Sequence, residues 1–114
     1  MQQQTPPIPE LIRWLRHFGN RPALYIRPVD VATAQSFLAG VNFCVQVLTG
    51  PFSREELDAV VVSRGWRVSA SPLPPPEESL EHQMRQRGMR DAEIIAELAE
   101  IEAVTLERRA GTAA

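Results

Sequence analysis

The segment from residue 31 to residue 48 constrains the fold of this chain more than any other stretch. Its apolar side chains recur at the spacing of an α-helix and cover most of the helix circumference. The polar side contracts to Gln35, Asn42 and Gln46. A helix that is apolar on most sides is usually surrounded by other elements. We therefore predict that 31–48 is the central helix of the fold, with Asp30 as its N-cap.

Two residues inside this segment carry further expectations. Gly40 lowers helix propensity by about 1 kcal/mol relative to alanine, and a close crossing by a second helix would explain that cost. Cys44 lies on the apolar stripe and has no histidine near it in the sequence. We expect it to be a small buried apolar residue in preference to a catalytic nucleophile.

Four more helices follow from apolar periodicity and from residues typical of helix ends. They are expected at about 9–18, 54–63, 77–87 and 91–109. The third helix of the chain begins with "SREE", a capping box in which Ser53 and Glu56 bind each other's backbone amides. The run Val60–Val62 leaves a strand as the alternative there. The helix at 77–87 has only Leu80 and Met84 on its apolar side, so we expect it to be weakly held.

Between the third and fourth helices, residues 66–76 alternate in character and then reach three consecutive prolines. Such a stretch is expected to be extended and to end as polyproline II. With 114 residues and 44% hydrophobic content, the chain is predicted to be a small, mostly α-helical single domain of about five helices with an extended Pro-rich crossing. We expect a disordered lead at 1–7, the helical domain at 8–109 and a frayed tail at 110–114.

Charge, cysteine content and motifs narrow the possible functions. The net charge of −2 makes nucleic acid an unlikely partner, and no apolar run long enough to predict a membrane span is present. A single cysteine excludes an intrachain disulfide and fits a reducing cytoplasm. His17 and His82 have no partners at metal-ligand spacing, and no phosphate loop or catalytic motif occurs. We therefore predict a protein without enzymatic activity and without a cofactor.

One pattern allows a comparison with known proteins. "NRPALYI" is followed after a short gap by "AQSFLAGVNF", so an Arg-Pro-x-x-Tyr turn precedes a helix that carries Phe-Leu-x-Gly. This arrangement resembles that of small, mostly uncharacterised bacterial proteins, some of which are thought to be toxin-immunity proteins. The commoner turn has Gly-Met before the Tyr and a Gly where this chain has Arg27. The resemblance implies a fold and, more remotely, an immunity-like role.

The turn itself is interpreted as a structural clasp, with a ligand site as the alternative. A proline disfavours helical geometry in the residue before it, so Pro22 prevents the first helix from continuing through Arg21. Pro28 disfavours helical geometry at Arg27 in the same way. The segment between the prolines should cross the surface in extended form. Tyr25 can lay its ring on the second helix while its hydroxyl finds a polar partner.

Glu102 is the one carboxylate that falls inside the apolar stripe of the last helix. An unpaired buried carboxylate is costly, so we expect an arginine partner or a water-filled gap beside it. Arg13, Arg64 and Arg67 are the candidates. A structural ion pair is the main interpretation, while an interface role and acid–base chemistry stay open.

The predicted function is non-enzymatic binding of another protein, which could be acidic, by an immunity or adaptor domain; a homo-oligomer is also considered. The candidate surface lies along residues 64–88, where Trp66 offers apolar area and Arg85 and Arg87 offer charged donors. The alternative is that Trp66 fills the core. The other functional alternative is a DNA-binding regulator with a helix-turn-helix-like segment at 80–106, although acidic residues on its second helix would repel phosphates.

Overall fold

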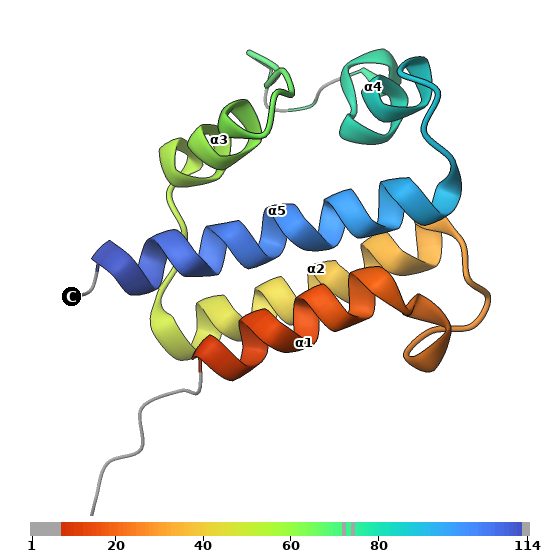
Figure 1. Ribbon diagram of the computed structural model, residues 1–114. Coiled ribbons are helices and arrows are strands. Elements are labelled where there is room, and N and C mark those ends of the chain that lie inside the picture. Colours follow the sequence, from red (N-terminus) through yellow and green to blue (C-terminus); the bar gives the residue numbers. More distant parts are fainter. Residues whose placement is uncertain (1–7, 72, 74, 113–114) are drawn as a thin grey trace, which may run out of the picture.

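The computed structural model describes residues 8–71, 73 and 75–112, and these residues form a small helical bundle without strands (Figure 1). In chain order the elements are α1 (Ile8–Asn20), η1 (Pro22–Leu24), α2 (Val31–Thr49), α3 (Arg54–Ser63), η2 (Pro76–Glu78), α4 (Leu80–Gln86) and α5 (Asp91–Thr112). The predicted mostly α-helical fold is confirmed. The expected lead at 1–7 and residues 113–114 of the expected tail lie outside the described residues, whereas 110–112 form the last turn of α5.

The predicted helix ends are set by the residues that the sequence indicated. The Asp30 carboxylate accepts a hydrogen bond from the Thr33 amide at 2.8 Å, which caps α2. Ser53 and Glu56 form the complete capping box at the start of α3. The chain then turns at Gly65 with φ of +89°, in the region that favours glycine. The predictions for Asp30 and for the capping box are confirmed, and α3 is a helix throughout.

The central helix is α5 and not α2, so that prediction is wrong. In Figure 1, α3 and α4 lie above α5 while α1 and α2 lie below it, and α5 packs against all four. Several of its side chains are fully buried, namely Ile94, Ile95, Ala99 and Ala103. By contrast, α2 buries only Val31, Ala34, Leu38 and Val45. Apolar content made α2 a candidate for the centre, but its outer side is left exposed by the described residues.

The helices α1 and α5 approach each other closely at Gly19. A Cβ atom at Gly19 would lie 2.9 Å from the Cβ of Ala99, so only glycine lets the two helices come this close. Arg16 extends the contact, because its guanidinium donates to Glu100 and to Glu107 at 2.9–3.0 Å. No described helix of the same chain makes the close crossing expected at Gly40, since a Cβ there would meet no described atom within 4 Å.

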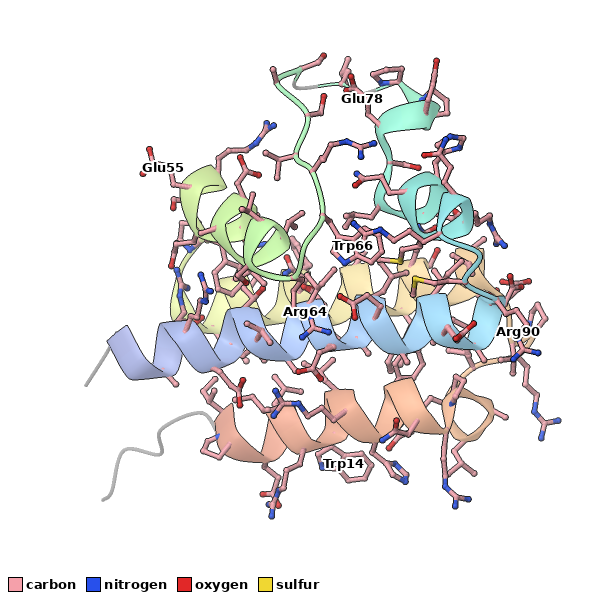
Figure 2. The ribbon with its side chains drawn as sticks, turned by 45° about the horizontal axis from the view of Figure 1, so that its top comes forward. Trp14, Glu55, Arg64, Trp66, Glu78 and Arg90 are labelled. Carbon is pink, nitrogen blue, oxygen red and sulfur yellow. The ribbon has the colours of Figure 1, made fainter. Side chains whose placement is uncertain are left out.

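The segment between α3 and α4 is held by buried contacts on both of its sides. Trp66 is only 6% exposed, and its indole donates to Glu97 on α5 at 3.0 Å (Figure 2). The buried side chain of Gln83 brackets the Arg67 backbone, accepting from its amide at 2.9 Å and donating to its carbonyl at 3.0 Å. Together with fully buried Met84, these contacts anchor α4 firmly, which corrects the expectation of a weak hold.

Candidate protein-binding surface

The outer side of α2 is an exposed surface with no charge. The helix contains no Asp, Glu, Lys or Arg in its 19 residues. Three of its large apolar side chains are mostly exposed, with Phe43 and Val47 at 67% and Leu48 at 72%. Its exposed residues are Ala32, Gln35, Ser36, Ala39, Gly40, Phe43, Cys44, Val47 and Leu48, which we call the α2 face. The expectation that Cys44 is buried is wrong, because its thiol belongs to this exposed face.

The α2 face changes in shape from one end of the helix to the other. Positions in its first half hold small residues such as Ala32 and Ser36, while the second half holds Phe43, Val47 and Leu48. At the middle, a Cβ added to Gly40 would meet no described atom within 4 Å. The face is therefore a shallow trough followed by an apolar ridge.

A groove between α1 and α2 continues this apolar surface. It has a volume of about 510 Å³ and is lined mainly by Ile8, Leu11, Trp14, Val45 and Leu48. Trp14 is 56% exposed, and Figure 2 shows its ring on the side of α1 that points away from α5. Sequence analysis did not single out Trp14, Phe43 or Leu48 as binding residues. The absence of charge over the whole of α2 was the signal that could have found them.

By length and composition, α2 is also the one helix in residues 8–71, 73 and 75–112 that could cross a membrane. Its 18-residue window has a mean hydropathy of 1.4, and 22% of that window is buried. No membrane span was predicted from the sequence, and the core helix of a soluble protein can also be this long and apolar.

The Arg-Pro-x-x-Tyr turn joins α1 to α2, but not in the extended form that was expected. Pro22–Leu24 form a 3₁₀ turn, and the Arg21 amide donates to His17 at the end of α1. The Tyr25 ring packs edge-on against the Phe18 ring, with 5.7 Å between the ring centroids. Its centroid lies 6.1 Å from that of the Phe37 ring on α2. The Tyr25 hydroxyl lies 2.6 Å from the His17 Nδ1 atom. These contacts are those of a clasp between the two helices.

Glu102 faces the underside of α2 and makes no ion pair with an arginine among the described residues, so the predicted ion pair is wrong. Its carboxylate accepts from the Asn42 amide at 3.4 Å, and Asn42 in turn accepts from Gln46 at 2.6 Å. Arg13 and Arg64 pair with Glu10 and Glu97 instead, and Arg67 lies beside α4. Burial raises the pKa of Glu102 to about 7, with the Asn42 hydrogen bond opposing the shift. The small cavity beside it, about 10 Å³, has room for roughly one water molecule.

The predicted partner-binding residues at 64–88 are occupied by contacts within the chain. Trp66 fills the core, which was the alternative interpretation, and the Arg87 guanidinium stacks on its ring at 4.0 Å. Arg87 also donates to the Gly65 carbonyl at 2.7 Å. Arg85 pairs with Glu81 and Asp91, both at 3.0 Å. An acidic partner would have to compete with these carboxylates for Arg85.

The helix-turn-helix alternative is not favoured by the geometry. Its second helix would be α5, which lies at the centre of the bundle with Ile94 and Ile95 fully buried. A recognition helix needs a free face to enter the major groove. Entry of α5 into DNA would therefore require the core to open.

Among residues 8–71, 73 and 75–112, no group of three or more His, Cys, Asp or Glu side chains is placed to hold a metal ion. His82 is exposed on α4, far along the chain from the His17–Tyr25 contact. Comparison of the chain with protein-family models, with curated proteins and with solved structures finds no match. The α2 face and the adjoining groove are the main exposed apolar surface of the described residues and the candidate binding site.

Proposed function

We propose that this chain is a non-enzymatic protein-binding domain, whose partner docks on the α2 face and the adjoining Trp14. The observation that carries the proposal is that a 19-residue helix without a single charge leaves three large apolar side chains, Phe43, Val47 and Leu48, mostly in solvent. Immunity against a toxin is the concrete form suggested by the resemblance of the chain, mainly over residues 10–48, to small bacterial proteins. A reducing cytoplasm, where the Cys44 thiol stays free, is the proposed location.

The size of the patch supports a binding role. Trp14, Phe43, Val47 and Leu48 together expose on the order of 500 Å² of side-chain surface, using about 150–250 Å² for each aromatic residue. Apolar patches of roughly 300–600 Å² are the largest that ordinary monomers show, and they are often functional. The chemistry of the patch also revises the expected partner, whose docking segment should be apolar and uncharged rather than acidic.

The packing of α2 argues against a membrane span as its normal state. Val31, Ala34, Leu38 and Val45 are buried against the rest of the bundle, and the Asn42 amide binds Glu102 beneath it. Insertion into a bilayer would separate these contacts and expose the core of the domain to water. Docking on the outer side of α2 leaves all of them in place.

The test uses a matched pair of valines. Val47 lies on the α2 face with 67% exposure, and Val62 lies on α3 with 57% exposure. We expect the product of the adjacent gene to bind the purified chain in calorimetric titration. Val47→Ser and Trp14→Ala should each weaken binding at least tenfold, while Val62→Ser should change it less than twofold. Equal effects of the two valine variants, or no binding at all, would overturn the proposal.

A further inference from the structure

We infer that a second copy of this chain docks on the α2 face, antiparallel to the first, with the two-fold axis passing through Gly40. The inference rests on the proposed function in that it takes the α2 face to be a docking surface. The occupant it names is different from the partner protein, and the two would compete for the same residues.

The position of Gly40 within α2 indicates where the two-fold axis of the dimer passes. It is the central residue of Val31–Thr49, and exposed residues stand at equal distances on both sides of it. Four residues away are Ser36 and Cys44, and eight residues away are Ala32 and Leu48. Rows of every fourth residue are the ridges by which two helices most often pack, crossing at about −50°. A two-fold axis at Gly40 lays this row onto the same row of the second copy, in reverse.

The sizes of the side chains match in this arrangement. Leu48, the largest in the row, comes opposite Ala32 of the second copy, and Cys44 comes opposite Ser36. In the neighbouring row, Phe43 comes near Ala39. A parallel pairing would instead place Phe43 against Phe43 and Leu48 against Leu48, and would leave the small half of the helix unfilled. The α2 face is therefore complementary to itself only in the antiparallel sense, as an isologous interface requires.

The dimer gives a physical reason for a glycine at position 40. Glycine inside a helix costs about 1 kcal/mol relative to alanine. Within the described part of the chain no atom lies close enough to Gly40 to need the missing side chain. At a two-fold axis the two α2 backbones approach each other most closely at this residue, so a side chain there would hold them apart.

The absence of charge on α2 favours a second copy of the chain over a lipid surface as the occupant of the α2 face. Helices that lie on membranes usually carry Lys or Arg along the rim of their apolar face. The α2 helix carries none, and its N-cap is the carboxylate of Asp30. A second copy presents the same uncharged positions, so no charge is buried in the interface. Stable dimers bury about 800 Å² on each partner. The exposed apolar side chains of the α2 face, which does not include Trp14, cover less than this area. This predicts a weak dimer that forms in the micromolar range and that a tighter partner could displace.

The first experiment measures self-association by sedimentation over roughly 1–500 μM protein, a range centred on the micromolar affinities discussed above. We expect a monomer–dimer equilibrium. Phe43→Glu should abolish it, and Val62→Glu on α3 should leave it unchanged. Gly40→Ala should weaken the dimer at least tenfold while making the monomer more resistant to urea, a combination that a misfolded variant could not give. A monomer at every concentration, or a dimer unaffected by Phe43→Glu, would overturn the inference.

The second experiment tests the direction of pairing with the chain's own thiol. Ser36→Cys in the presence of native Cys44 should give a disulfide-linked dimer on mild oxidation, because the antiparallel arrangement brings these positions together. The two cysteines are eight residues apart on one helix, about 12 Å, too far for a bond within the chain. Faster cross-linking of the native chain through Cys44 alone would indicate parallel pairing and overturn the inference. Binding to phosphatidylcholine vesicles without dimer formation would overturn it in favour of lipid.

The two proposals fail separately. A chain that stays monomeric but binds the neighbouring gene product through Val47 overturns the dimer and leaves the proposed function intact. A chain that dimerises through α2 but binds no other protein overturns the proposed function and leaves the dimer intact.

Discussion

Replacing Glu102 with glutamine should make the protein more stable at pH 8 and should remove the fall in stability that is expected of the native chain above pH 5. The carboxylate lies under α2, where its partner is the Asn42 amide at 3.4 Å. Because burial disfavours the charged form, it raises the pKa of Glu102 to about 7 from an ordinary value of 4.5. Glutamine keeps the shape of the side chain and the acceptor for Asn42 but has no charge to bury.

The size of the effect follows from the shift in pKa. Between pH 4.5 and 7 the folded state holds the proton that the unfolded state has released, so the free energy of unfolding falls as the pH rises. The contribution of the protonated carboxyl is complete below pH 4.5 and is lost as the pH passes through 7. At 1.36 kcal/mol for each pKa unit, the loss amounts to about 3 kcal/mol.

Other carboxylates act in a different pH range. Hydrogen bonds from the Ser53 backbone and from Arg16 lower the pKa of Glu56 and Glu107 respectively. Their stabilising effects are present at neutral pH and are lost only in acid, below their ordinary values. The change in the free energy of unfolding between pH 5 and pH 8 can therefore be compared between the native chain and the Glu102 variant without interference from these two groups.

The assay is urea unfolding followed by circular dichroism at pH 5, 6, 7 and 8, at a protein concentration low enough to keep the chain monomeric. Glu102→Gln should exceed the native stability by about 2–3 kcal/mol at pH 8 and by less than about 1 kcal/mol at pH 5. Glu55→Gln, which removes the same charge from an exposed position on α3 (Figure 2), serves as the control. A Glu102→Gln variant that keeps the native slope, or is less stable at pH 8, would refute the reasoning.

Three further substitutions test the packing. Gly19→Ala should destabilise the fold by about 1–3 kcal/mol in urea, even though alanine favours helices, because its Cβ would lie 2.9 Å from that of Ala99. Arg109→Met should cost about 2 kcal/mol and speed amide exchange at the end of α2, since Arg109 donates to two carbonyls there at 2.6 and 2.7 Å. Gln83→Leu should cost about 2 kcal/mol by leaving both backbone groups of Arg67 unpaired, and limited proteolysis should then cut between α3 and α4.

The helices could be predicted from the sequence because local chemistry sets their ends. Asp30 and the pair Ser53 and Glu56 bind amides within three residues of themselves, so the information is contained in a few neighbouring positions. Such features act in the same way whatever the rest of the fold is.

The packing could not be predicted in the same way, because it depends on which surfaces meet. Apolar periodicity indicates that a helix side will be covered, but not whether the cover comes from the same chain. For this reason α2 was expected at the centre, and the close approach was assigned to Gly40 when it belongs to Gly19. The partner of Glu102 was missed for a related reason: an amide such as Asn42 gives no charge pattern that would single it out.

The place of α5 in the bundle has a consequence for how the chain folds during its synthesis. The four other helices all pack against α5, and α5 is the last of the described elements to leave the ribosome. At about 5–20 residues per second, its 22 residues take about 1–4 s to be made. Throughout that interval α2 lacks its contacts with α5 and the hydrogen bonds that Arg109 donates at its C-terminal end. A nascent chain stalled before residue 91 would therefore be a strong substrate for chaperones that bind uncharged, apolar helices.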